Sequence, residues 1–144
     1  MNIPWNRDMM GNTEYKAAFD RVVLPIAKQF QPDLTLVSCG FDAAAADMIG
    51  EYILTPPMYA YMTQQLKHVS NGKLLLLLEG GYSPKAIGEC FSACLEVLLT
   101  DTAADLDLDI TGDPCKRAKQ TIENVVRTQS KYWNLEEVSH AVKH

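Results

Sequence analysis

The segment that decides the fold is residues 34–50, LTLVSCGFDAAAADMIG. It begins as an apolar strand, breaks at Gly40 and then places Asp42 and Asp47 in a loop. A buried strand that ends in glycine and carboxylates is a common way for an open α/β fold to place acidic groups at the edge of its sheet. Residues 74–82, LLLLLEGGY, repeat this form. The chain therefore carries two strand-to-loop units, and each ends in side chains suited to chemistry.

Segments of helical periodicity alternate with these two strands. Apolar residues recur three or four positions apart in residues 13–31, in residues 56–69 after the predicted cap Thr55, and in residues 84–99. Strands that alternate with helices are typical of repeated βα units with right-handed crossovers, so the two strands are expected to be parallel. The unbroken leucines of residues 74–78 predict a central strand that is buried on both faces. Both loops should then meet at one edge of the sheet.

Proline and aspartate give further expectations for the rest of the chain. Pro25 lies inside the first apolar stripe and should kink that helix. Residues 100–114 are rich in aspartate but lack the central glycine and terminal glutamate of an EF-hand, so a solvated loop is expected there rather than a calcium site. A last helix is expected from Cys115 to Trp133, followed by a frayed tail in residues 134–144.

The composition is that of an ordinary globular domain. The 144 residues are 47% apolar and 22% charged, which suits one domain with its own core. The net charge of -5 argues against nonspecific binding to nucleic acid or to anionic membranes. The sequence shows neither a transmembrane-length apolar run nor a signal-peptide pattern, which favours an intracellular protein. The four cysteines form no C-x-x-C pair, so reduced thiols packed in the core are expected.

The two loops hold the side chains that could carry chemistry. Asp42 and Asp47 are suited to metal binding or acid–base catalysis, but they could equally cap a helix, and the residues alone leave both readings open. Gly80 and Gly81 would let backbone approach a ligand closely, and Tyr82 could donate a hydrogen bond to a developing oxyanion. A tight turn with a packed tyrosine explains the same residues. The histidines lie late in a helix or in the tail, and the sequence has no H-x-H, H-E-x-x-H or P-loop motif.

Taken together and in their order, these motifs resemble a known family. They resemble the C-terminal third of a zinc-dependent histone deacetylase, and the class II branch most closely. The residues that carry the resemblance are NIPW at 2–5, VSCGFDA at 37–43, DMIG at 47–50, LTP at 54–56, LEGGY at 78–82 and SKYW at 130–133. The resemblance implies that residues 1–144 are the C-terminal segment of a deacetylase catalytic domain. The expected fold is then an incomplete three-layer α-β-α parallel sheet of the arginase type.

The resemblance also assigns roles to single residues. It implies that Zn²⁺ is held by two aspartates and a histidine, and that Asp47 is one of these aspartates. Tyr82 is then the residue that polarises the acetyl carbonyl. Leu54 maps onto a wall of the acyl-lysine channel, and Gly80 and Gly81 map onto the backbone beside the tyrosine. Asp42 matches a family position that is not a metal ligand and is expected to support its loop.

The sequence departs from the family pattern in two ways. Ala46 and Met48 replace the glycine and proline that flank the aspartate ligand, and Ala46 would be strained if the backbone there required a positive φ. The paired catalytic histidines and the Asp-x-His motif with the other two zinc ligands are not found in this sequence. Since zinc needs three protein ligands for catalysis, this chain alone is expected to be inactive.

The expected function is therefore a zinc-dependent lysine deacetylase, with acetylated lysines of histones or other proteins as substrates. Two alternatives stay open from the sequence. One is a non-catalytic form that acts through protein interaction, by self-association or with corepressor partners. The other is a deacetylase of acetylated polyamines. The resemblance implies a nuclear or cytoplasmic protein with no direct contact to nucleic acid or membrane.

Overall fold

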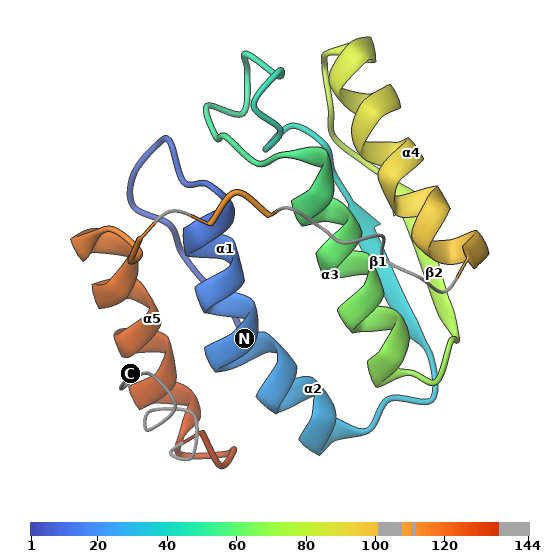
Figure 1. The fold of residues 1–144 in the computed structure, drawn as a ribbon. Coiled ribbons are helices and arrows are strands. Elements are labelled where there is room, and N and C mark those ends of the chain that lie inside the picture. Colours follow the sequence, from blue (N-terminus) through green and yellow to red (C-terminus); the bar gives the residue numbers. More distant parts are fainter. Residues whose placement is uncertain (101–107, 111, 136–144) are drawn as a thin grey trace.

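The computed structural model describes residues 1–100, 108–110 and 112–135 and shows a parallel α/β arrangement (Figure 1). In chain order the elements are α1 (Asn12–Ala18), the π-helix η1 (Phe19–Val23), α2 (Leu24–Phe30), β1 (Thr35–Cys39), α3 (Pro56–Val69), β2 (Leu74–Leu78), α4 (Pro84–Thr100) and α5 (Lys116–Gln129). Strands β1 and β2 pair in parallel, with Thr35 opposite Leu74 and Cys39 opposite Leu78. The predicted βα units and their parallel strands are therefore confirmed.

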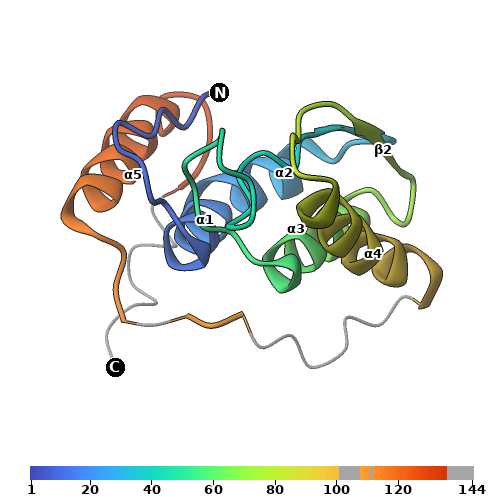
Figure 2. The same cartoon turned by 90° about the horizontal axis from the view of Figure 1, so that it is seen from above.

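Helices α3 and α4 cover one face of the two-stranded sheet, as Figure 2 shows. Val37 and Leu76 of the sheet pack against a core that includes Met58 of α3 and Cys90 and Cys94 of α4. The two cysteines are free and buried, as expected from the sequence. This core fixes the positions of both strand ends.

The opposite face of the sheet is not covered by any helix or strand among the described residues. Leu36 of β1 and Leu75 and Leu77 of β2 are exposed. The prediction that residues 74–78 are buried on both faces is therefore wrong for this chain, because within the described residues no helix lies on the second face. An uninterrupted leucine run indicates a strand suited to apolar contacts on both of its faces. Here the face that carries Leu75 and Leu77 is exposed.

The first helical segment is irregular just before Pro25. The N–H of Leu24 donates to the carbonyl of Phe19, five residues earlier, which is the spacing of a π-helix. Because proline has no N–H, the regular α-helical hydrogen bond cannot form at residue 25. The segment ends at Phe30, where Gln31 adopts a left-handed conformation with φ of 53°. The irregularity expected from Pro25 is thus a π-helical turn that precedes the proline.

Helix α3 begins at Pro56 after Thr55, as predicted, but Thr55 does not cap it with its hydroxyl. The Thr55 hydroxyl instead accepts a hydrogen bond of 2.8 Å from the side-chain amide of Asn12. The Asn12 side-chain oxygen in turn accepts the Thr55 N–H at 3.1 Å. This reciprocal pair joins the start of α1 to the start of α3.

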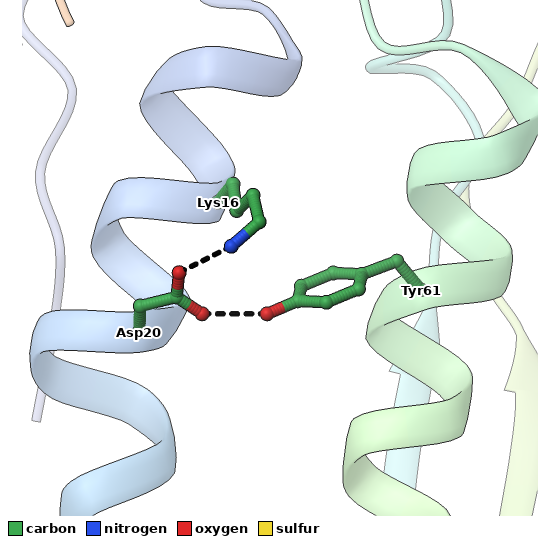
Figure 3. Close-up of polar contacts among 3 residues, drawn as sticks. All are labelled: Lys16, Asp20 and Tyr61. Carbon is green, nitrogen blue, oxygen red and sulfur yellow. Dashed lines mark hydrogen bonds and ion pairs between the residues drawn. The ribbon is translucent and has the colours of Figure 1, made fainter. Parts of the chain in front are cut away.

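A second polar link joins the first helical segment to α3 (Figure 3). The Tyr61 hydroxyl donates a hydrogen bond of 2.5 Å to one oxygen of Asp20. The Lys16 ammonium lies 2.5 Å from the other oxygen of the same carboxylate. Burial and the contact with Asp20 raise the pKa of Tyr61, so the phenol remains a donor at neutral pH. Lys16, Asp20 and Tyr61 together hold the segment against α3.

Helix α5 packs on the far side of the first helical segment, which lies between α5 and α3 in Figure 1. Its Ile122 and Val125 form a second apolar cluster with Ala18 and Val22. The last helix was expected from Cys115 to Trp133; it begins at Lys116 and ends at Gln129, four residues before Trp133. No helix in the described part of the chain combines the length and apolar character needed to span a membrane.

Parts of two predicted segments lie outside the described residues. The acidic loop expected at residues 100–114 is described only at residues 100, 108–110 and 112–114, and the tail expected at 134–144 only at 134 and 135. The solvated loop and the frayed tail therefore stay predictions.

Removal of the Tyr61 hydroxyl tests the link to α3. Tyr61→Phe is expected to lower the free energy of unfolding by about 1 kcal/mol, because a half-buried carboxylate loses its donor. Urea unfolding followed by circular dichroism measures this change. Tyr132→Phe is the matched control. Because Tyr132 is exposed, this variant should unfold at the same urea midpoint as the wild type. Equal midpoints for all three proteins would show that the link contributes nothing to stability.

Candidate functional site

The two loops meet beyond the carboxyl ends of β1 and β2. The N–H of Glu79 donates to the carbonyl of Cys39 at 3.2 Å, and the N–H of Phe41 donates to the carbonyl of Gly80 at 2.9 Å. The parallel pairing thus continues past the strands into both loops. This places residues 40–50 beside residues 79–83 at the edge of the sheet where open α/β folds hold their sites.

Asp47 joins the two loops through its carboxylate. One oxygen accepts the backbone N–H of Tyr82 at 2.6 Å and that of Ser83 at 3.1 Å. The other oxygen accepts the N–H of Ile49 at 2.9 Å and, more weakly, that of Gly50 at 3.4 Å. The side chain is only 3% exposed. A carboxylate in this position both closes its own loop and holds the turn that carries the tyrosine.

These hydrogen bonds keep Asp47 ionised. The N–H of Tyr82 is the largest of the causes that lower the pKa of this carboxyl, followed by the N–H of Ile49. Donors that bond to the charged form of an acid favour that form. Asp47 therefore presents a negative charge at the edge of the sheet, which is the state that a metal ligand requires.

Asp42 occupies a different place from Asp47. A Cβ atom added at Gly80 would lie 2.6 Å from a carboxylate oxygen of Asp42, and one added at Gly40 would lie 3.1 Å from the other oxygen. The Asp42 side chain thus stands directly over the backbone of both loops. These are the contacts of a loop support, and they distinguish two aspartates that residue type alone leaves equivalent.

The backbone geometry explains two further features of the loops. Gly81 has φ of 130°, and a Cβ atom there would lie 2.9 Å from Ile87. Only glycine fits this position without strain. Ala46, by contrast, is not among the residues with positive φ, so the alanine that replaces the family glycine is accommodated without backbone strain.

The remaining predicted site residues separate into exposed and buried ones. Tyr82 is 61% exposed, so its side chain is accessible to another molecule. Leu54 is 1% exposed and packs in the core with Phe41, Ala44 and Met58. The structure thus brings Asp47, Gly80, Gly81 and Tyr82 together at one edge and places Leu54 in the core beneath the loop. The role of Leu54 as a channel wall stays a prediction.

Tyr59 is a residue whose environment the sequence did not reveal. Its ring contacts Phe41, with 5.1 Å between ring centroids, and its hydroxyl is buried without a hydrogen-bond partner in the described residues. Burial raises the pKa of Tyr59, which keeps the phenol neutral. Helical periodicity marks position 59 only as part of α3, so the sequence carried no signal of an unpaired hydroxyl.

The described residues do not form a complete zinc site. A catalytic zinc site uses three protein ligands and keeps a position open for water or substrate. Among the residues that the structure describes, no group of three or more His, Cys, Asp or Glu side chains is placed to hold a metal ion. Asp47 supplies a buried, ionised carboxylate, but one carboxylate does not hold zinc tightly.

The comparison with known domains decides the family. Residues 1–98 match the model of the histone deacetylase domain. The chain belongs to the histone deacetylase family. Its sheet edge and its two loops are therefore part of an incomplete deacetylase fold, as the sequence predicted.

Several histone deacetylases are similar over nearly the whole chain. The chain is 44% identical over 140 residues to histone deacetylase clr3 of Schizosaccharomyces pombe and 41% identical over 140 residues to histone deacetylase HDA1 of Saccharomyces cerevisiae. Each alignment covers 97% of this chain and 20% of the relative. Polyamine deacetylase HDAC10 of Mus musculus is 40% identical over 134 residues, covering 92% of this chain and 20% of the relative. The chain thus spans about one fifth of these relatives.

Two solved deacetylase structures are similar in three dimensions. The structure of the histone deacetylase Clr3 has a TM-score of 0.87 and 45% identity, over 94% of this chain and 22% of that chain. The HDA15 HD domain also has a TM-score of 0.87, with 36% identity, over 99% of this chain and 39% of that chain. The arrangement of elements described above is therefore that of a deacetylase domain, in part.

Substitution of Gly80 tests the close contact with Asp42. Gly80→Ala is expected to lower the free energy of unfolding by about 1 kcal/mol, because the new methyl group displaces the carboxylate. Gly88→Ala is the matched control, since open space surrounds that position in α4 and alanine should stabilise the helix by about 0.5–1 kcal/mol. Thermal and urea unfolding measure both changes.

A second substitution separates this contact from other effects of alanine. In an Asp42→Ala background the methyl group at residue 80 has room, so Gly80→Ala should cost less there than in the wild type. An equal cost in both backgrounds would mean that Asp42 does not set the requirement for glycine.

Proposed function

We propose that this chain supplies one zinc ligand, Asp47, and the oxyanion-stabilising residue, Tyr82, of a zinc-dependent lysine deacetylase. The proposal is supported chiefly by one observation, the hydrogen bond of 2.6 Å from the N–H of Tyr82 to the carboxylate of Asp47. This bond brings together the two residues to which the family resemblance gives catalytic roles. They lie thirty-five positions apart in the sequence, so nothing local places them side by side.

Tyr82 is suited to stabilise charge that develops on a substrate carbonyl. Its phenol is exposed, while its backbone is held by Asp47 and by the glycines that precede it. Holding the backbone at residue 82 limits the positions that the phenol can take, and a donor that is ordered before the reaction stabilises an oxyanion better than a mobile one. Gly80 and Gly81 present backbone without side chains beside this donor, as a narrow acyl-lysine channel requires.

The rest of the site would come from residues outside this chain. Because Asp47 is a single ligand, two further ligands and a general base are needed before zinc chemistry can occur. Residues 1–144 would then be the C-terminal segment of the catalytic domain. The chain by itself is expected to show no deacetylase activity.

The substrate class follows from the family and from the charge of the chain. Acetylated lysines of histones or other proteins are the substrates that we propose, in the nucleus or the cytoplasm. A net charge of -5 favours contact with basic protein segments over nucleic acid. Deacetylation of acetylated polyamines is the second candidate, because a polyamine deacetylase is among the relatives at 40% identity.

A chimera tests the roles of Asp47 and Tyr82. The segment of the Clr3 deacetylase that matches this chain is replaced by residues 1–144, and activity is measured on an acetyl-lysine peptide. The chimera is expected to be active and the isolated chain inactive. Tyr82→Phe should lower kcat about 100-fold or more, because the oxyanion loses a donor.

Two controls complete this test. Tyr132→Phe removes an exposed hydroxyl just beyond the end of α5, outside both loops, and should leave kcat unchanged. Asp47→Ala should reduce the zinc content of the purified chimera, as measured by elemental analysis. Full activity in Tyr82→Phe, or full zinc content in Asp47→Ala, would contradict the proposed roles.

A further inference from the structure

The open face of the sheet is an apolar surface that no element in the described part of the chain covers. We define the open sheet face by Leu34, Leu36, Leu75 and Leu77, which are 55%, 60%, 48% and 45% exposed. Register places Leu36 opposite Leu75, so the leucines of both strands form one continuous patch. Contiguous apolar patches that remain exposed commonly mark interaction surfaces.

The edges of the sheet are open as well as its face. Strands β1 and β2 pair only with each other among the described strands, so each keeps one edge with unpaired backbone groups. Parallel sheets are almost always covered on both faces and extended by further parallel strands. An edge of unpaired N–H and C=O groups readily accepts another strand. The missing contacts are therefore those of a third layer and of neighbouring strands.

The similar structures indicate what supplies these contacts. The solved Clr3 chain superposes on 94% of this chain, yet this chain covers only 22% of Clr3. For the HDA15 domain the corresponding values are 99% and 39%. Most of each deacetylase chain thus lies outside the part that this chain reproduces. That remaining polypeptide is long enough to cover a sheet face and to extend both edges.

We infer that the open sheet face binds the remaining part of a histone deacetylase domain, and that it does so even when that part is a separate polypeptide. The partner adds a parallel strand to the sheet and lays apolar residues on Leu36, Leu75 and Leu77. Its recognition depends on backbone pairing and apolar contact, so it requires no metal and no catalysis. The inference therefore stands independently of the proposed roles of Asp47 and Tyr82.

A second copy of this chain fits the face less well. Pairing of identical edge strands about a two-fold axis makes them antiparallel, so it does not extend a parallel sheet. Ser38 of β1 pairs with Leu77 of β2, so its hydroxyl group belongs to the same exposed face as the leucines. Two copies stacked face to face would bury these hydroxyls without adding a donor or acceptor from a partner strand.

Co-expression tests the inference directly. Tagged residues 1–144 are produced together with the Clr3 deacetylase from which the matching segment has been deleted, and the complex is captured through the tag. The wild-type chain is expected to retain the Clr3 polypeptide in a molar amount equal to its own. The variant Leu36→Ser with Leu75→Ser should retain about tenfold less or lower, because it removes two apolar contacts at the centre of the face.

Matched variants on another surface control for nonspecific adhesion. Phe91→Ser with Leu99→Ser removes two exposed apolar side chains of α4, away from the strands, and should retain the Clr3 polypeptide like the wild type. Circular dichroism melts of the purified chains confirm that both variants fold, since all four side chains are exposed in this structure. The Clr3 segment itself, supplied as a separate chain, is the positive control.

Each outcome decides the inference. Equal retention of the Clr3 polypeptide by the wild type and by the Leu36→Ser, Leu75→Ser variant would overturn it. Capture of the Clr3 polypeptide by the Clr3 segment but not by this chain would also overturn it. Capture by neither would overturn assembly from separate polypeptides. A wild-type homodimer that the same two substitutions dissociate would assign the face to a second copy instead. Retention without deacetylase activity would contradict only the proposed function.

Discussion

The site depends on one carboxylate that bonds to two loops at once. Asp47 closes its own loop through the N–H of Ile49 and holds the second loop through the N–H groups of Tyr82 and Ser83. A buried carboxylate is costly unless donors surround it, so this arrangement is stable only when both loops are correctly placed. The same requirement links the position of the tyrosine to the folding of the sheet. The residue that we propose as a zinc ligand is therefore also the residue that joins the two loops.

The sheet beneath this carboxylate is packed on one face and uncovered on the other within the described residues. Helices α3 and α4 fix the strands from one face, and polar links through Asn12 and Tyr61 attach the first helical segment to α3. The second face carries leucines that nothing in the described part of the chain covers. Under the proposed function, Asp47 and Tyr82 would form part of a deacetylase site, and the open sheet face is the surface on which we infer that the rest of the domain assembles. Membership of the histone deacetylase family explains both features.

Much of this could be predicted from the sequence. Helical and strand periods located the βα units, since each pattern reflects one buried face, and the motif order identified the family. The exposure of Leu75 could not be predicted, because a run of leucines indicates only that both faces of the strand are apolar. It does not show which face the described chain covers. Asp42 and Asp47 could not be distinguished by residue type, and their separation depends on which backbone groups each carboxylate meets. The Tyr59 hydroxyl, which has no hydrogen-bond partner in the described part of the chain, owes its burial to three-dimensional packing alone.

Amide hydrogen exchange measures the central interaction most directly. The N–H groups of Tyr82 and Ser83 lie in an exposed turn, and the contact with Asp47 gives them an acceptor. In the wild-type chain both amides should exchange slowly, and in Asp47→Ala they should exchange at the rate of an open loop while the amides of β2 stay protected. Fast exchange of both amides in the wild type, or unchanged protection in Asp47→Ala, would contradict the account.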